Sequence, residues 1–148
     1  MRQRRRLAKE RQTRAPSKRQ YQAIAHFRHQ LRCFLAFSEA AAAGAGAPAQ
    51  QHQALLAIAG WGEGTPTVGA LAERLLIAPH TGAELIDRMA RAGLLKKRPS
   101  KADRRKIELV LTQKAAALLR RLTSVHVKEI RTRAPSLIAA LRRIRGEL

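Results

Sequence analysis

"TVGALAERLLIAPHTGAELIDRMARAGLLKKRPSKADRRKIELVLT", Thr67 to Thr112, is the stretch that predicts the fold. Thr67 can cap a first short helix, because a threonine side chain at a helix start accepts a backbone N–H bond. Pro79 suits the first turn of a second helix, where its missing N–H costs nothing, and Gly93 follows that helix where a left-handed residue is expected. The stretch therefore begins with two short helices joined by a tight turn.

A hairpin is predicted after the second helix. Residues 94–98 and 106–111 are two short runs suited to strands, and the charged segment between them forms the loop. In the second strand, alternation places Ile107, Leu109 and Leu111 toward the core. Two short helices followed by a hairpin predict a winged helix-turn-helix, so the expected fold class is mainly α with a small β-hairpin wing.

The second helix, which is expected to run from Pro79 to about residue 91, has two faces when it is projected at 3.6 residues per turn. One face can pack on the preceding helix, and it carries Gly82, Leu85, Ile86 and Met89. The opposite face would point outward, where a major groove of DNA could receive it as a recognition helix. This outward face consists of His80, Thr81, Glu84, Arg88 and Arg91.

The outward face allows some specific contacts with bases. Arg88 can pair with guanine N7 and O6, and Thr81 can bond to a base or a phosphate. Glu84 could accept from a cytosine amino group, but it also stands four residues before Arg88, which is the favourable order for a helix ion pair. We favour the ion pair for Glu84, because such pairs are common on solvated faces, and we expect another between Asp87 and Arg91.

The chain on either side of this stretch is predicted to be helical. Apolar residues at steps of three and four indicate a first helix over residues 21–43, and a second helix covers about residues 49–59. A long helix starts after Thr112, and Pro135 is expected to break it and to start a last helix. The predicted order is therefore four helices, a two-stranded hairpin and two helices.

Charge is the strongest clue in the composition. Thirty Lys and Arg against ten Asp and Glu give a net charge of +20 in 148 residues. Such a field attracts polyanions, of which nucleic acid is the first candidate and an anionic membrane surface the second. Nine bases and one acid fall within residues 2–19, so residues 1–19 are predicted to form a basic flexible tail that either contacts DNA or only increases solubility.

Other classes of protein are disfavoured by what the sequence lacks. The single Cys33 excludes an internal disulfide and a cysteine zinc site, and it suits a reducing compartment. No apolar run is long enough to span a bilayer, and the N-terminus does not have the pattern of a secretory signal. Motifs for phosphate binding or nucleophilic catalysis are missing, so we expect no enzyme, no metal site and no cofactor. The expected location is the cytoplasm, in association with the nucleoid.

From Tyr21 onward the chain resembles the MarR family of bacterial transcriptional regulators. The "DRM…GLL" segment matches the end of the family's recognition helix, and Asp103 and Arg105 match its wing signature of Asp, any residue and Arg before a strand ending in Leu-Thr. The "FLAFSEAAAAG…QQHQALLAIAG" segment is similar to the first two helices of one branch. The chain departs from the family at Ala115, where Gly is usual, and at Glu84, where Arg is frequent.

The resemblance implies a homodimer that binds double-stranded DNA and no membrane. Residues 20–148 would form a single MarR-like domain, with dimerisation helices at 20–46 and 113–148 and the winged helix-turn-helix lobe at 49–112. The two recognition helices would enter successive major grooves of a pseudo-palindromic operator. The dimerisation residues would be Ile24, Phe27, Leu31, Leu122, Val125, Leu137 and Leu141.

The wing tips would reach into the flanking minor grooves of the operator. By the resemblance, Asp103 orients Arg105, and Arg104 occupies the variable position between them. From the residues alone, Asp103 could equally pair with Arg104 or another base. The wing contacts would come from Arg98, Lys101, Asp103, Arg104 and Arg105.

The function expected on this basis is that of a repressor that a small-molecule effector releases from DNA. His52 and Phe34 are the candidate residues for the effector pocket. A sequence-nonspecific nucleoid-binding protein is the alternative that the charge of +20 would also explain. A weaker alternative is a redox sensor through Cys33, although we favour a small residue buried among the neighbouring apolar positions, Leu31, Phe34 and Leu35.

Overall fold

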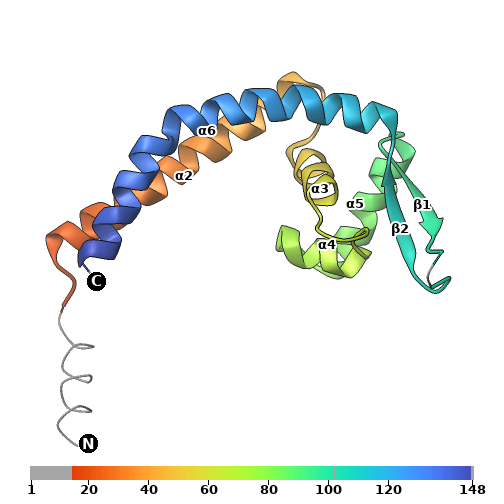
Figure 1. Cartoon of the computed structure of the whole chain (residues 1–148), viewed down its shortest axis with the longest axis horizontal. Coiled ribbons are helices and arrows are strands. Elements are labelled where there is room, and N and C mark those ends of the chain that lie inside the picture. The colour runs from red at the N-terminus through yellow and green to blue at the C-terminus, as the bar shows by residue number, and fades with distance from the viewer. Residues whose placement is uncertain (1–14, 102, 148) are drawn as a thin grey trace, which may run out of the picture. The chain divides into compact units, whose positions relative to one another are not determined.

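The computed structural model describes residues 15–101 and 103–147 (Figure 1). Within this part of the chain, no helix is both long and apolar enough to cross a membrane. Residues 1–14 of the predicted tail lie outside the described residues, and helix begins before that tail was expected to end. The elements are α2 (Lys18–Gly44), α3 (Ala49–Ala59), α4 (Val68–Leu75), α5 (Pro79–Arg91), β1 (Leu95–Pro99), β2 (Ile107–Leu111) and α6 (Gln113–Glu147).

The described residues fall into two compact units. The winged unit comprises residues 35–129, which include α3, α4, α5, the hairpin and the adjoining parts of α2 and α6. The helical unit comprises the described residues up to 34 and from 130, which are the remaining parts of α2 and α6.

The predicted winged helix-turn-helix is confirmed, and its boundaries follow from the expected signals. The Thr67 side chain accepts the backbone N–H of Ala70 at 3.2 Å and caps α4. Pro79 is the first residue of α5, and Gly93 follows the helix with φ at +70°. In the turn between the two helices, Leu76 takes a left-handed conformation with φ at 56°, which the sequence did not signal.

The wing is an antiparallel hairpin in which Leu95 pairs with Leu111 and Pro99 with Ile107. Leu109 of β2 is buried, and Leu111 is partly buried against the core, as the alternation predicts. The expectation for Ile107 was wrong, because this side chain is 49% exposed. Ile107 belongs to the last strand pair before the loop, and its partner there, Pro99, is also exposed.

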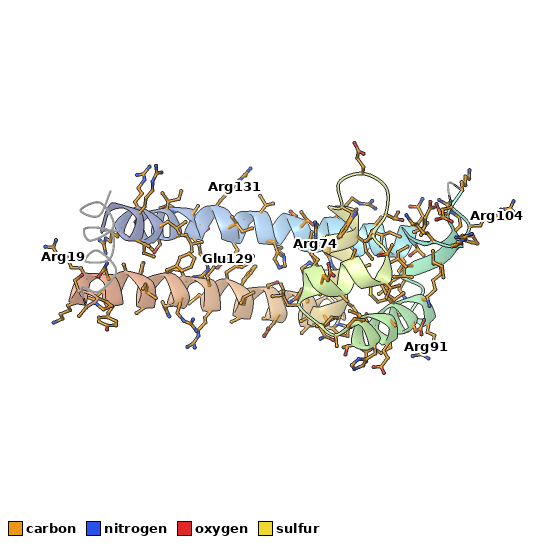
Figure 2. All side chains as sticks on the ribbon, turned by 90° about the horizontal axis from the view of Figure 1, so that it is seen from below. Arg19, Arg74, Arg91, Arg104, Glu129 and Arg131 are labelled. Carbon is orange, nitrogen blue, oxygen red and sulfur yellow. The ribbon has the colours of Figure 1, made fainter. Side chains whose placement is uncertain are left out.

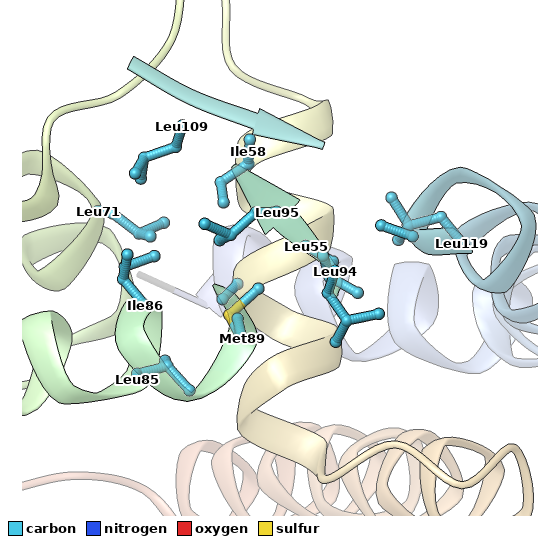
Figure 3. Close-up of a cluster of buried hydrophobic side chains, with 12 residues drawn as sticks. Leu55, Ile58, Leu71, Leu85, Ile86, Met89, Leu94, Leu95, Leu109 and Leu119 are labelled. Atoms are coloured by element: carbon cyan, nitrogen blue, oxygen red, sulfur yellow. The ribbon is translucent and has the colours of Figure 1, made fainter. Parts of the chain in front are cut away.

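The core of the winged unit joins α3, α4, α5, the hairpin and the first turns of α6 (Figure 3). Leu55, Leu71, Leu85, Met89 and Leu109 are each 1% exposed or less. Burial of a side chain of this size stabilises a fold by about 2 kcal/mol. Because the inner face of α5 is fixed in this way, its opposite face is held toward the solvent.

The predicted break at Pro135 was wrong, because α6 continues through this residue to Glu147. A proline inside a helix lacks one backbone hydrogen bond and costs about 3 kcal/mol. Contacts within the helical unit offset that cost: His26 Nε2 of α2 lies 3.0 Å from Ser136 Oγ, and Ala23 and Ala140 are both buried. Tertiary packing therefore overrides the local signal, and one helix follows the hairpin among the described residues where two were predicted.

Candidate nucleic-acid interface

Helix α5, the predicted recognition helix, crosses α4 at very short range. A Cβ atom built on Gly82 would lie 2.8 Å from the Cβ atom of Ala72, which real side chains essentially never do. Gly82 and Ala72 are therefore small because the two helices must touch at this point. The crossing fixes the orientation of α5 relative to α4.

The predicted outward face of α5 is exposed to solvent. Figure 2 shows Arg91 pointing away from the lobe at one end of this face. Of the five predicted residues, Thr81 is partly buried and the other four are exposed. The face thus offers hydrogen-bond donors and acceptors along the length of α5. Its exposed members are His80, Glu84, Arg88 and Arg91.

The two ion pairs predicted within α5 are not present among the described residues. Asp87 pairs with Lys97 of β1, which holds the pKa of Asp87 below its usual range mainly through this hydrogen bond. Arg91 adds only a smaller Coulomb attraction, so the expected Asp87–Arg91 pair was wrong. The expected Glu84–Arg88 pair was also wrong, because neither side chain has an ion-pair partner within residues 15–101 and 103–147. The i, i+4 rule found suitable spacing but could not anticipate that the wing supplies a partner.

Asp103 shapes the loop at the wing tip through the backbone. Its carboxylate accepts the backbone N–H of Arg105 at 3.0 Å, and its carbonyl accepts the backbone N–H of Lys106 at 2.9 Å. In the described structure the carboxylate forms no ion pair with the guanidinium of Arg104 or Arg105, so the expected orientation of Arg105 through its side chain was wrong. A short carboxylate reaches an amide two residues on more readily than the end of a long arginine. Asp103 therefore shapes the wing tip by fixing the backbone of the loop.

The basic side chains of the wing differ in whether they already form an ion pair, and we call those that form none the uncommitted group. Arg98 donates to Glu108 across the hairpin at 3.0 Å, and this bond is the main reason why the pKa of Glu108 is lowered. Lys101, Arg104 and Arg105 are exposed and have no ion-pair partner in the part of the chain that the structure describes. Figure 2 shows Arg104 extending from the tip. The uncommitted group can bind an anion without first breaking an ion pair.

Two basic residues of the winged unit make specific contacts that the sequence did not predict. The Arg74 guanidinium, at the end of α4, lies 4.0 Å from the centre of the Trp61 ring (Figure 2). Lys114 donates to the carbonyl of Ala92 at 2.8 Å and so satisfies the end of α5. Neither contact has a local signal, because each joins a loop or helix end to a residue far along the chain.

A buried histidine pair lies in the winged unit. His52 is 2% exposed, and its Nε2 atom has no hydrogen-bond partner in the described structure. The centre of its ring lies 4.8 Å from that of His126. His126 Nδ1 lies 2.6 Å from the carbonyl of Leu122, so it carries a proton, and Nε2 lies 2.8 Å from Ser38 Oγ. The cluster joins α2, α3 and α6.

The effector pocket predicted at His52 and Phe34 stays a prediction. His52 is buried, while Phe34 is partly buried and belongs to the helical unit. The winged unit has a separate cleft of about 350 Å³ between the loop after α2, the end of α5, and Lys114 and Arg121 of α6. Arg121 donates to the carbonyl of Ala45 there at 3.1 Å.

We expect His52 to make the fold less stable in mild acid. Burial, and then the neighbouring His126, lower the pKa of His52 in the folded chain. In the unfolded chain His52 has a pKa near 6.5. As the pH falls below that value, His52 is protonated in the unfolded chain before it is protonated in the folded chain. The free energy of unfolding should therefore fall between pH 6.5 and the lower folded pKa. Urea unfolding from pH 5 to 8 measures this.

His52→Leu is the variant that isolates the effect, since it removes the titrating group and keeps an apolar side chain at a buried site. Its pH slope should be smaller than that of the natural chain. His29→Gln is the matched control, because His29 is exposed on α2 and should leave the slope unchanged. An equal slope in the natural chain and His52→Leu would show that His52 does not cause it.

Cys33 is less buried than predicted. Cys33 is partly exposed, and its Sγ atom lies 3.5 Å from His29 Nε2, one turn earlier on α2. Leu31 is 40% exposed, so the apolar surroundings expected for the thiol are incomplete in the single chain. The favoured interpretation as a buried residue was therefore wrong.

The predicted dimerisation residues divide by exposure. Ile24, Leu31, Val125 and Leu141 are between 40% and 50% exposed, which is unusual for large apolar side chains. Phe27 and Leu137 are partly buried, whereas Leu122 is already buried within the chain. The exposed members form apolar surface on α2 and α6 that no part of the described chain covers.

The residues of the lobe match a known family. Residues 45–106, which span α3 to the wing loop, match the model of the MarR family. The sequence of the winged-helix lobe is therefore similar to that of the MarR family. No curated protein sequence matches the chain significantly.

Solved structures share the MarR fold with this chain. AbsC of Streptomyces coelicolor, a MarR-family transcriptional regulator, is 21% identical with a TM-score of 0.67, and the match covers 81% of each chain. A mutant of MepR from S. aureus, bound to an oligodeoxyribonucleotide, is 18% identical with a TM-score of 0.60 over 82% of this chain and 94% of that one. CouR from Rhodococcus jostii RHA1, bound to p-coumaroyl-CoA, is 17% identical with a TM-score of 0.59 over 66% and 68%. At these identities the likeness establishes the MarR fold.

Proposed function

We propose that this chain is a sequence-specific transcriptional regulator that binds double-stranded DNA as a homodimer in the cytoplasm. The observation that carries the proposal is the pairing of an exposed polar face on α5 with a wing tip whose cations are uncommitted. A helix of this kind fits the major groove, and an extended arginine fits the narrow minor groove. The MepR structure bound to an oligodeoxyribonucleotide shares this fold and supports the proposal.

The net charge supplies the affinity that does not depend on sequence. Each phosphate contact by Lys or Arg releases counterions and steepens the log–log salt dependence of binding by about 0.9. The natural excess of twenty positive charges gives a strong attraction to any duplex. Discrimination between sequences must then come from α5.

The homodimer is proposed from the uncovered apolar surface of α2 and α6. Large exposed apolar residues gather on these two helices, and such surface normally marks an interface. A second copy would bury the same residues on both sides, as two-fold symmetry requires. The residues proposed for this interface are Ile24, Phe27, Leu31, Val125, Leu137 and Leu141, with Leu122 supporting them from inside the chain.

We further propose a repressor that a small-molecule effector releases from DNA. CouR, which shares the fold, is bound to p-coumaroyl-CoA in its structure. The cleft beside Lys114 and Arg121 has the size at which ligand pockets begin, about 300 Å³. An effector can act only if it binds one spacing of the two recognition helices more tightly than the other.

Selection of bound duplexes from a random pool tests the proposal. A homodimer should select two inverted half-sites whose centres lie about one helical turn, or a multiple of it, apart. A pool without a consensus, or with a single half-site, would contradict the proposed mode of binding.

Arg105→Ala should weaken DNA binding and reduce the slope of log affinity against log salt by about 0.9, because one phosphate contact is lost. The dimer and its melting temperature should remain nearly unchanged, since Arg105 is exposed at the wing tip. Fluorescence anisotropy at several salt concentrations measures the slope, and sedimentation measures the dimer. Dissociation of the dimer in this variant would show instead that Arg105 has a structural role.

A further inference from the structure

Glu84 lies at the centre of the exposed face of α5. At 3.6 residues per turn, His80, Glu84, Asp87 and Arg91 follow one line along the helix, opposite the buried face that contains Met89. Glu84 is exposed and stands in the first half of the helix, which is the half that usually contacts bases in a helix-turn-helix. Its carboxylate would therefore face the floor of a major groove that receives α5.

Every other acid of the recognition helix and the wing is engaged by a donor. Asp87 pairs with Lys97, and Glu108 pairs with Arg98. Asp103 accepts the backbone N–H of Arg105. Glu84 alone among these acids has neither an ion pair nor a hydrogen bond to its carboxylate in the part of the chain that the structure describes.

A bare carboxylate is unfavourable beside a polyanion unless it finds a donor there. Such a group repels the phosphates and must also give up its water as the groove closes around it. Major-groove edges differ in what they offer: guanine presents two acceptors, thymine an acceptor and a methyl group, and adenine an acceptor beside its amino donor. Cytosine presents its N4 amino donor with no acceptor of its own beside it. Cytosine is therefore the base that compensates a carboxylate best.

We propose that Glu84 is a specificity-determining residue that accepts a hydrogen bond from the N4 amino group of one cytosine in each half-site. The inference rests on the proposed function and adds the base that this helix position selects. Glu84 lowers affinity for every duplex through repulsion and recovers that loss only where cytosine is present. It thus sharpens discrimination against random DNA in a chain whose overall charge favours indiscriminate binding.

Three chains, the natural one, Glu84→Gln and Glu73→Gln, would each select duplexes from the same random pool. Glu73 is exposed on α4 and has no ion pair among the described residues, so its replacement makes the same change of charge outside the proposed contact. The natural chain and Glu73→Gln should both select cytosine at one position in each half-site. Glu84→Gln should admit adenine beside cytosine at that position, because its amide adds a donor that adenine N7 accepts, while the rest of the consensus is kept. Titration with the cytosine site and its adenine-substituted form should give a ratio of roughly tenfold for the natural chain and near one for Glu84→Gln.

The outcomes separate this inference from the function on which it rests. If the natural chain selects an inverted repeat and Glu84→Gln selects the same bases with the same ratios, Glu84 reads no base and the inference alone fails. A loss of preference at a position other than cytosine would also overturn it. If the natural chain selects no sequence, the proposed function fails together with the inference. Melting temperatures of the variants should match, because both residues are exposed.

Discussion

Gly82→Ala is expected to destabilise the winged unit and to weaken DNA binding at the same time. The added Cβ would lie 2.8 Å from the Cβ of Ala72, and neither atom belongs to a flexible chain that can move aside. The helices α4 and α5 must therefore separate, and overpacking of this kind costs about 1–3 kcal/mol. Because the orientation of α5 relative to α4 would then change, affinity for a selected duplex should fall as well. Urea unfolding and anisotropy titrations measure the two effects.

Gly69→Ala is the matched control for this experiment. Gly69 is exposed on the neighbouring helix α4, and a Cβ there would meet nothing within 4 Å. Its replacement should leave binding unchanged and stabilise the fold by up to about 1 kcal/mol, since glycine is unfavourable in a helix. Adding Ala72→Gly to Gly82→Ala should restore part of the lost affinity. Equal effects of the two glycine replacements would contradict the close crossing of α4 and α5.

Arg88→Ala is expected to cost about 1–3 kcal/mol of binding free energy on a selected duplex and far less on a random one. Arg88 is exposed on α5 and has no ion-pair partner among the described residues. It can therefore pair with guanine N7 and O6 without first breaking an ion pair. Loss of a base contact relaxes selection at one position. It should change the salt dependence less than Arg105→Ala does, because phosphate contacts set that slope.

Arg131→Ala serves as the charge-matched control, because Arg131 is exposed on α6 in the helical unit (Figure 2). It should lower affinity for selected and random duplexes by the same small factor. The role assigned to Arg88 is wrong if Arg88→Ala behaves like this control, with the consensus unchanged.

The elements of the lobe could be predicted because their signals are local. A capping threonine at Thr67, a proline at the start of α5 and a left-handed glycine at Gly93 each act within a few residues. The outward face of α5 followed from the helical period alone. These signals placed the helices and the hairpin to within a residue or two.

The errors arise where distant residues decide the outcome. Pro135 stays inside α6, where His26 of the distant helix α2 contacts the adjacent Ser136. Asp87 turns to Lys97 because the wing brings that lysine beside α5. Asp103 bonds to a backbone amide because the loop folds around it. Spacing along the sequence can suggest partners, but it cannot rank them against groups that only the tertiary fold brings near.

The central claim is that the polar face of α5 recognises a sequence and does not merely follow charge. The most direct test is competition, at physiological salt, between the DNA upstream of the chain's own coding region and a random duplex of equal length. Sequence-specific regulators bind their sites at least about a thousandfold more tightly than other DNA. We predict a ratio of this order. A ratio near one would contradict the account and would identify a nonspecific nucleoid-binding protein driven by its charge of +20.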